Sequence, residues 1–482
     1  MFNVVWFKRD LRLFDHEPLF TAISNQYPCL LLFVLEPMLL NAEDYSERHW
    51  QFMRDCLRDM SSKLRDSNFS SFYILQGDVL DIFRALRKEY GDFQLFSHQE
   101  TGNHLTFQRD VEIKKWCQQK DIVWKEFKQF GVDRGRKNRQ NWQVQWSKLM
   151  QKKIYEFPVD NIKEFPLRKS FTENYRPDIT ITTNKNIQKG GSEEALQVFN
   201  SFLQTRHRTY TKHISKPIES RVSCSRLSPH IAWGSISIRF IVQNMAKTKQ
   251  ANSFALKNFK SRLFWHCHFV QKLESDPSLE FRNQNRTYDS IRTEFNKEYY
   301  EKYTKGQTGI PMVDASIRCL KETGYLNFRL RAMLVSFWSH LLWQPWTEIS
   351  KFLARAFTDY EPGIHYAQLQ MQSSTIGYHT IRIYNPIKLA KDHDPTGEFI
   401  KRWVPELKNL PTDLVIEPWR INPMEEVFYN FALEDNYFVP IVDLAQSSKR
   451  AADVLYALVN TKKSKVIAKS IMKIHVNKKG QS

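Results

Sequence analysis

Short apolar runs alternate with helical patterns along the first 130 residues. Runs of mostly apolar residues, typical of buried strands, lie at 4–7, 29–35, 72–75, 93–96 and 122–127. Between them, the stretches 47–65 and 107–119 space their apolar residues as amphipathic helices do. This alternation of strand and helix predicts βαβ units and therefore a doubly wound parallel sheet.

No phosphate-binding fingerprint accompanies this pattern. The motif GxGxxG does not follow the first predicted strand, and the chain contains no Gly-Lys dipeptide. A Rossmann-type dinucleotide site and a P-loop both need these signatures. Residues 1–130 are therefore predicted to form an α/β domain whose ligand these motifs do not define.

The pattern dissolves between residues 131 and 191, where polar and basic residues prevail. The stretch 125–153 holds nine Lys or Arg residues and two acids, with Trp142 and Trp146 among them. A solvated linker that crosses the surface between two domains is the favoured interpretation. A dedicated nucleic-acid site is the alternative.

Aromatic-rich helical patterns replace the strands in the rest of the chain. Residues 192–445 are predicted to form an all-α domain. The last segment, 446–482, carries nine basic residues and one acid, Asp453. We expect a basic tail whose first half is helical and whose end is loose.

Composition points towards nucleic acid. The chain of 482 residues carries 71 Lys and Arg against 52 Asp and Glu, a formal charge of +19, and 14% of its residues are aromatic. Phosphate contacts and base stacking draw on these two residue classes. A basic protein with no nucleic-acid ligand is the alternative, so composition alone leaves the partner open.

Simple features exclude other classes of protein. The apolar run at 30–35 is far shorter than the ~20 residues that span a bilayer, and charges arrive too early for a signal peptide. Six scattered cysteines without a CxxC motif favour a reducing cytoplasm over a disulfide framework or a cysteine-bound metal. Because no cysteine follows Cys319, no iron–sulfur cluster is expected in the C-terminal part.

A short polar segment is a candidate phosphate-binding site. Ser225, Arg226, Leu227 and Ser228 precede an apolar helical pattern. Free backbone N–H groups and the helix dipole at such a start attract anions. An ordinary helix N-cap is the more frequent explanation of such a segment.

Two histidines follow a tryptophan in the sequence WHCH, which raises the question of a metal. In a helix successive residues are ~100° apart, so His266 and His268 diverge by ~200° and cannot share one ion. We therefore predict no metal site here. Trp265 is expected in the core unless other evidence places it in a cleft.

Several charged residues occur within an apolar helical region. Buried Arg and Asp side chains destabilise a fold unless they are paired or bound to a ligand. Arg331 and Asp359 form a plausible pair, and Glu361 and His365 follow in a loop broken by Pro and Gly. An internal salt bridge and a charged cofactor explain these residues equally well.

Taken together, these segments resemble the photolyase/cryptochrome family. The resemblance rests on VVWFKRDLRLFDHEPL, CSRLSPHIAWGSIS, GQTGIPMVDASIRCLKETGYLNFRLRAML, RIYNP, DHDPTGEFIKRWVPEL and YFVPIVD. These motifs occur in the family's order and span nearly the whole chain, so in combination they are highly specific. The resemblance implies an N-terminal α/β domain and an all-α C-terminal FAD-binding domain.

The resemblance also implies which residues hold the cofactor. The FAD phosphates would rest beside Tyr210 on the polar segment Ser225, Arg226, Leu227 and Ser228. Cys224 stands where the family often has Thr, so one hydroxyl contact is lost. Glu361 is a further cofactor-binding residue by resemblance.

Other residues resemble the family's catalytic centre. Arg331 and Asp359 match an Arg–Asp pair beside the isoalloxazine ring, where a paired Arg can stabilise negative charge. Trp265 matches the Trp that lines the lesion pocket, where a flipped pyrimidine dimer would stack. The catalytic set expected from the resemblance is Trp265, Arg331, Asp359 and His365.

The lesion pocket departs from the family pattern. Arg262 stands where photolyases of cyclobutane dimers usually have Glu, and Asn327-Phe328 replaces His-Asn. His365 falls at the position of an Asn near flavin N5. Arg262, Trp265 and Asn327 are nevertheless expected to contact the lesion or its DNA.

The family's chain of three electron-carrying tryptophans is interrupted. Leu369 occupies the flavin-proximal position, and 288–295 lacks the outer Trp, whereas Trp346 matches the middle member. Trp338 and Trp343 lie on the same helical stretch and could supply a detour. Two core tryptophans are the favoured alternative.

The main functional hypothesis is a light-driven photolyase that repairs UV-damaged DNA. Reduced FAD, excited directly or through an antenna, would donate an electron that splits a pyrimidine dimer. A cyclobutane dimer is favoured, and Arg262 leaves the (6-4) photoproduct open. The segment 98–102 lies where relatives contact an antenna pigment, and folate, deazaflavin or no pigment would be compatible with it.

A cryptochrome-like blue-light receptor is the second hypothesis. The interrupted Trp chain and the altered lesion pocket favour it, whereas the short basic tail suits DNA better than a signalling extension. A family member that has lost both roles is the third. Neither a membrane nor an obligate protein partner is indicated, and the cytoplasm is the expected location.

Overall fold

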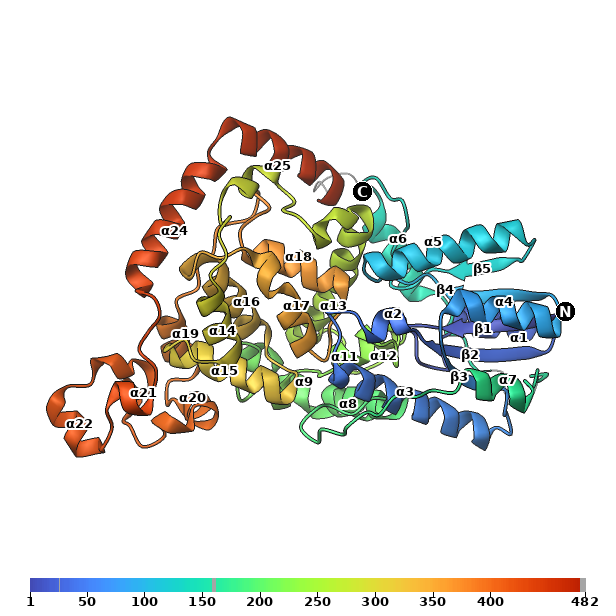
Figure 1. The fold of residues 1–482 in the computed structure, drawn as a ribbon, viewed down its shortest axis with the longest axis horizontal. Helices are drawn as coiled ribbons and strands as arrows, with labels where there is room; N and C mark the ends of the chain where they lie inside the picture. Colours follow the sequence, from blue (N-terminus) through green and yellow to red (C-terminus); the bar gives the residue numbers. More distant parts are fainter. Residues whose placement is uncertain (26, 158–161, 477–482) are drawn as a thin grey trace.

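The chain folds into an α/β half and a larger helical half that lie end to end (Figure 1). The computed structural model describes residues 1–25, 27–157 and 162–476. Among these residues, every helix is too short or too polar to cross a membrane.

The α/β half contains one parallel sheet with the strand order β3-β2-β1-β4-β5. Its strands are β1 (Phe2–Phe7), β2 (Cys29–Leu35), β3 (Phe72–Gln76), β4 (Phe93–His98) and β5 (Trp124–Phe127). Each predicted strand matches an observed one to within two residues at either end. The predicted doubly wound parallel sheet is therefore confirmed.

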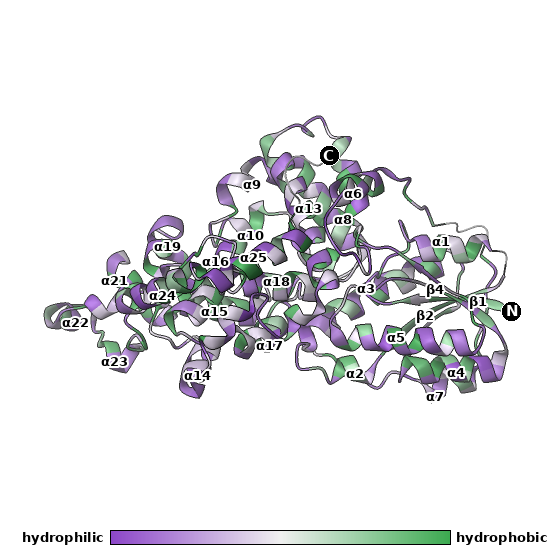
Figure 2. Ribbon diagram, turned by 90° about the horizontal axis from the view of Figure 1, so that it is seen from above, coloured by the Kyte–Doolittle hydropathy of each residue, from purple (hydrophilic) through white to green (hydrophobic). Residues whose placement is uncertain are grey.

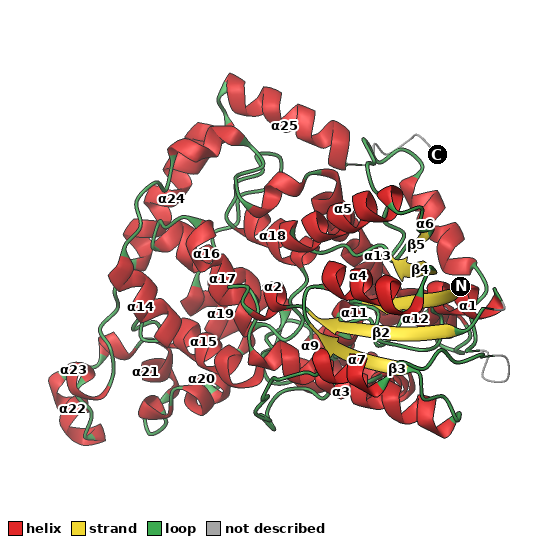
Figure 3. Cartoon of the chain, turned by 45° about the vertical axis from the view of Figure 1, so that its right-hand side comes forward, coloured by secondary structure: helices red, strands yellow, loops and turns green. Residues whose placement is uncertain are grey.

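Both faces of this sheet are buried because alternate side chains point to opposite sides. Val5 and Phe7 pack with α1 and α3, whereas Val4 and Trp6 pack with α4 and α5. Figure 3 shows the strands enclosed by helices, and Figure 2 shows them as largely hydrophobic. The helices of this half are α1 (Glu17–Ser24), α2 (Pro37–Leu40), α3 (Glu47–Asp66), α4 (Val79–Tyr90) and α5 (His104–Gln119).

The segment between the two halves carries α6 (Trp142–Gln151) and α7 (Lys169–Asn174). Trp142 and Trp146 are buried, and both rings lie 5.2 Å from the ring of Phe264. The interpretation as a solvated linker is therefore wrong at α6, because two indoles supply a packing face that the surrounding basic residues obscure in the sequence.

The helical half begins at Ser192 and surrounds a large apolar core. Its first helices are α8 (Ser192–Ser201), α9 (His207–His213), α10 (Ser220–Ser223), α11 (Ser228–Ala232), α12 (Ile238–Ala246) and α13 (Phe254–Ser275). The next are α14 (Lys297–Lys305), α15 (Pro311–Thr323), α16 (Phe328–Ser336), α17 (Trp346–Ala356) and α18 (Pro362–Gln372). Those that follow are α19 (Pro386–His393), α20 (Glu398–Trp403), α21 (Thr412–Ile416), α22 (Pro423–Tyr429) and α23 (Leu433–Asn436).

Two helices end the described chain, α24 (Leu444–Val459) and α25 (Lys462–His475). They run along one edge of the helical half, and α25 returns towards α6 (Figure 1). The prediction of a loose end is wrong for α25, which buries Ala468, Ile471 and His475. Its apolar residues occupy one face among many lysines, so the helix packs although its composition is basic. Residues 477–482 of the predicted tail lie outside the described residues.

The two halves meet closely at Gly234. Its carbonyl accepts a hydrogen bond of 2.9 Å from Arg12, and the neighbouring Trp233 carbonyl accepts one of 3.1 Å from the Leu11 N–H. Gly234 has a φ of +72°, and a Cβ atom there would lie 2.4 Å from the carbonyl oxygen of Arg9. Only glycine allows this approach, which positions the first strand against the helical half.

Candidate functional site

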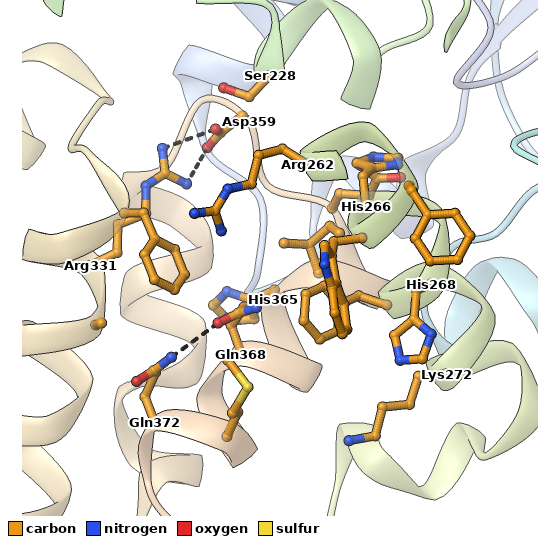
Figure 4. Close-up of a pocket in the computed structure, with 18 of the residues that line it drawn as sticks. Ser228, Arg262, His266, His268, Lys272, Arg331, Asp359, His365, Gln368 and Gln372 are labelled. Atoms are coloured by element: carbon orange, nitrogen blue, oxygen red, sulfur yellow. Dashed lines mark hydrogen bonds and ion pairs between the residues drawn. The ribbon is translucent and has the colours of Figure 1, made fainter. Parts of the chain in front are cut away.

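A cavity of about 1510 Å³ opens in the helical half. Helices α13, α16 and α18 form its main walls, and α6 and α25 line the end near Lys272. Figure 4 shows Arg331 and Asp359 on one side and His268 and Lys272 on the other. The volume exceeds the ~300–1,000 Å³ of a typical small-molecule site, so a cofactor and a second ligand fit together.

The predicted phosphate-binding segment lies on the wall of this cavity. Ser225, Arg226 and Ser228 line it, and Arg226 has a φ of +60° that turns the segment sharply before α11. The Arg226 guanidinium lies 3.5 Å from the ring centre of Tyr325. Its buried Nη1 has no hydrogen-bond partner among the described residues. A phosphate oxygen would satisfy this donor, so the segment fits the phosphates of FAD.

The other residues expected near the FAD phosphates lie partly in the cavity and partly in the core. Tyr210 and Cys224 line the cavity, although Tyr210 is mostly buried against Phe202 and Phe259. The side chain of Leu227 is fully buried in the same apolar cluster and does not reach the cavity. No side chain of the described residues caps α11, so the structure does not support the N-cap alternative.

Arg331 and Asp359 form the expected ion pair. Arg331 donates from Nη1 to Oδ1 and from Nη2 to Oδ2, both at 2.9 Å, and its guanidinium lies 4.1 Å from the ring centre of Phe357. Burial works to raise the pKa of Asp359, but the charge and hydrogen bonds of Arg331 outweigh it and lower this pKa. Because the Arg331 side chain is still 26% exposed towards the cavity, the pair can also face a negatively charged ring.

Glu361 is paired with a residue that the sequence did not single out for this role. Its Oε2 lies 2.6 Å from Nε2 of His266. Burial lowers the pKa of His266, but the Glu361 charge dominates and raises the pKa to about 10. His266 is therefore an imidazolium on the cavity wall, and its buried Nδ1 has no partner in the described chain. The two residues are 95 positions apart in the chain, so sequence patterns do not reveal this pairing.

His365 lines the cavity as a neutral imidazole. Its Nε2–H donates to the carbonyl of Ser350 at 2.9 Å, which leaves Nδ1 as an acceptor. Burial lowers the pKa of His365 to about 4. The residue expected near flavin N5 therefore presents a lone pair rather than the amide of an asparagine.

Trp265 lies in the cavity rather than in the core. The side chain is 45% exposed, and its ring centre lies 5.0 Å from that of His268 on the next turn of α13. Arg262 lines the same wall, 5.9 Å from the ring centre of Phe328, which is 40% exposed. The expectation of a core tryptophan, which came from the helical pattern alone, is thus wrong, whereas a position in a cavity is what the family resemblance implies. The apolar spacing of α13 could not reveal this because a helix face beside a cavity has the same pattern as one beside a core.

The side-chain amide of Asn327 forms hydrogen bonds within the fold. Its Oδ1 accepts from the N–H of Leu330 at 3.0 Å and caps α16, and its Nδ2 donates to Ser220 at 3.3 Å. The residue touches the cavity but is 4% exposed. Its amide therefore has little capacity left for a ligand.

The candidate electron carriers lie away from the cavity wall. Trp338 and Trp346 are buried in the same apolar cluster as Leu369, which does line the cavity. The indole N–H of Trp338 donates to the Pro345 carbonyl at 2.7 Å. Trp343 lies between the guanidinium groups of Arg292 and Arg450, about 5 Å from each. These positions leave the proposed electron route a prediction.

The segment 98–102 lies at the carboxyl end of the sheet, where doubly wound folds bind ligands. His98 bonds to Asp10 at 2.7 Å, and Glu100 pairs with Arg109 at 2.5 Å. The cavity beside Glu100 and Arg109 measures about 30 Å³. A pigment needs far more space, so these side chains would have to move before one could bind here.

Asp10, His16 and His98 lie close enough to hold a metal ion. Nδ1 of His16 accepts from the N–H of Leu19 at 3.1 Å, so its Nε2 carries the proton and donates to Asp10 at 2.9 Å. His98 donates to the same carboxylate oxygen. Protonated ring nitrogens cannot ligate a metal, and hydrogen bonds account for this cluster.

Two family models match the chain. Residues 3–131 match the model described as DNA photolyase, and residues 259–457 match the FAD binding domain of DNA photolyase. Together they cover more than half of the chain, and the second includes the cavity walls formed by α13, α16 and α18.

Similar proteins carry two kinds of name. A deoxyribodipyrimidine photo-lyase of Alkalihalophilus pseudofirmus is 25% identical over 470 residues, which are 93% of this chain and 96% of that protein. Cryptochrome-1 of Macaca fascicularis is 23% identical over 477 residues, 92% of this chain and 81% of that protein. The structure of a Synechocystis cryptochrome has a TM-score of 0.83 at 19% identity and covers 94% of this chain and 99% of its own. The last comparison shows a shared fold.

Proposed function

Because the chain belongs to the photolyase/cryptochrome family, we propose that it is a light-driven photolyase that repairs pyrimidine dimers in UV-damaged DNA. Cyclobutane dimers are the favoured substrate. The observation that carries the proposal is the exposed indole of Trp265 in a cavity with room for two ligands. An enzyme that acts on a stacked base must first extrude it, and an aromatic wall stabilises the extruded base.

The cofactor would occupy the side of the cavity formed by the ion pair and the phosphate segment. Ser225, Arg226 and Ser228 would hold the phosphates, while Arg331 and Asp359 would orient the ring. Reduced FAD, when bound there, supplies the light-excited electron that opens the dimer. Arg331 stabilises negative charge on its side of the cavity, and Asp359 keeps Arg331 in position.

The lesion would occupy the side formed by α13. Trp265 would stack on the extruded bases, and the cation of Arg262 would replace the acceptor that related photolyases place near the thymine edge. The charge of +19 supports this arrangement, because the backbone of DNA must be held independently of its sequence. The (6-4) photoproduct is the second substrate to test, since Arg262 changes the polarity of this wall.

The deciding experiment is a repair assay with the flavin-loaded protein. An oligonucleotide with one thymine cyclobutane dimer is illuminated with the reduced protein, and the recovery of thymine absorbance is measured. We expect recovery that requires both light and reduced flavin. A dark reaction and an oxidised sample serve as controls. If neither this lesion nor a (6-4) photoproduct is repaired, the proposal is wrong.

A blue-light receptor is the second candidate. Among the described residues, Trp338, Trp343 and Trp346 do not line the cavity, and Leu369 occupies its wall where the family has an electron-carrying Trp. Relatives named cryptochrome support this candidate as well. A change of oligomeric state or of partner affinity on illumination, without repair, would favour the receptor.

A further inference from the structure

The far end of the cavity gathers buried cations. Arg139, which precedes α6, and Lys272 on α13 are each 2% exposed, and both line the cavity. Neither forms an ion pair with any residue in the described ranges. Three histidines lie around them and are held neutral by burial and by the neighbouring cations: His268, His379 and His475.

Within the described part of the chain, the donors of Arg139 and Lys272 are largely unused. Nη2 of Arg139 donates to the carbonyl of His268 at 3.1 Å, but its Nε and Nη1 have no partner among residues 1–25, 27–157 and 162–476. Nζ of Lys272 lies 5.9 Å from the ring centre of Tyr378. Burial and Arg139 lower the pKa of Lys272 to about 7, although Asp276 acts in the opposite direction. A buried guanidinium and a partly protonated buried amine destabilise the fold unless an anion reaches them, and a bound anion would favour the charged form of Lys272.

The position of this end relative to Trp265 indicates which anion it takes. Trp265, His268 and Lys272 follow a spacing of three and four residues, so they share one face of α13. Seven residues along a helix correspond to about 10 Å, a distance that a nucleic-acid strand spans between a base and a nearby phosphate. Figure 4 shows His268 and Lys272 on the side of the cavity away from Arg331 and Asp359. The end is walled by Tyr378, Met472 and Val476.

We propose that Arg139 and Lys272 form a phosphate-binding subsite for the DNA strand whose base stacks on Trp265. The guanidinium of Arg139 can donate two parallel hydrogen bonds, and the ammonium of Lys272 supplies a compact positive charge. A phosphate group satisfies both. The assignment to DNA rests on the proposed repair function. The binding of a phosphate group does not depend on that function, since a free phosphate or a mononucleotide would satisfy the same donors.

The test compares Arg139→Met and Lys272→Met with Lys115→Met, an exposed residue of α5 in the other half. Binding of the flavin-loaded protein to an undamaged, labelled single strand is measured by anisotropy at several salt concentrations. Each subsite variant should reduce the slope of log affinity against log salt by about 0.7, the value for one phosphate contact on a single strand. The Lys115 variant should leave the slope unchanged. Equal slopes in all proteins would overturn the assignment to DNA.

Inorganic phosphate distinguishes the sources of the anion. It should raise the melting temperature of the wild type and leave that of the double variant unchanged. Stabilisation by phosphate together with unchanged DNA slopes would show a site for a free anion and contradict the DNA assignment. In phosphate-free buffer Lys272→Met should melt no lower than the wild type, because the described residues provide no ion-pair partner for this buried amine. A marked fall in melting temperature would reveal an internal partner and refute the subsite. None of these measurements depends on DNA repair. A failure of the subsite proposal can therefore be distinguished from a failure of the proposed repair function.

Discussion

Nε2 of His266 lies 2.6 Å from Oε2 of Glu361, and this buried pair connects α13 to the residue that precedes α18. The two helices pack against each other, and both line the cavity. The charge of Glu361 keeps His266 protonated at neutral pH, since it raises the pKa of the imidazole to about 10 against the effect of burial. The protonation state of His266 therefore affects the contact between α13 and the start of α18.

The pair makes stability depend on pH in a defined direction. The pKa of His266 is about 6.5 in an unfolded chain and about 10 when folded, so the stabilisation is complete below pH ~6.5 and is lost as the pH rises through 10. Glu361→Gln should lower the free energy of unfolding by about 1–3 kcal/mol at pH 6, with the difference from wild type closing towards pH 10. Denaturant unfolding at several pH values checks this.

An exposed ion pair provides the control for this profile. Glu298→Gln breaks a surface contact with Lys302 and should change stability by less than about 1 kcal/mol at every pH. A Glu361→Gln profile parallel to the wild type would show that His266 is neutral in the folded protein.

Asp359→Asn should weaken the retention of flavin, because Arg331 loses the charge that holds its guanidinium in position. The ratio of flavin to protein absorbance after gel filtration measures the effect. Asp453→Asn, at an exposed position of α24, should keep the wild-type ratio. Equal flavin content and equal photoreduction in the Asp359 variant would remove this residue from the cofactor site.

Trp265→Ala should weaken the binding of dimer-containing DNA by about 1–3 kcal/mol if a base stacks on the indole. The large exposure of the side chain means that the truncation leaves little cavity in the core, so stability should change little. Phe428→Ala removes an aromatic ring from α22 that is more exposed than Trp265, at 79%, and should not alter affinity. Equal affinities for damaged DNA in the Trp265 variant and the wild type would leave the indole without a role in the lesion pocket.

Gly234→Ala should destabilise the contact between the two halves by about 1–3 kcal/mol, because the added Cβ overlaps the backbone of Arg9. Gly135→Ala is a matched control, since Gly135 has a similar φ of +70° but no atom within 4 Å of the added Cβ. The difference between the two melting temperatures isolates the overlap from the backbone strain. Similar losses in both variants would show that strain alone accounts for the effect.

The sequence by itself determined the strands of the α/β half and indicated the Arg331–Asp359 pair as one of two explanations, beside a charged cofactor. The run at 29–35 identifies a strand because seven successive apolar residues are too hydrophobic for a surface and too short for most helices. The pair could be expected because charges within an apolar region require partners. The first argument uses residues that are adjacent in the chain. The second follows from one large free-energy term, the cost of burying an unpaired charge.

The tertiary structure alone decided where polar residues meet and which apolar faces are left open. It left Trp265 exposed in a cavity, which helical periodicity does not distinguish from a core position. It also packed Trp142 and Trp146 against α13 and buried one face of the basic helix α25. It also joined His266 to Glu361 and, among the described residues, left Nε and Nη1 of Arg139 without a hydrogen-bond partner. The periodicity of a helix shows that one face is apolar but not what covers it. Contacts between residues about 100 positions apart depend on how whole helices pack, which no local pattern encodes.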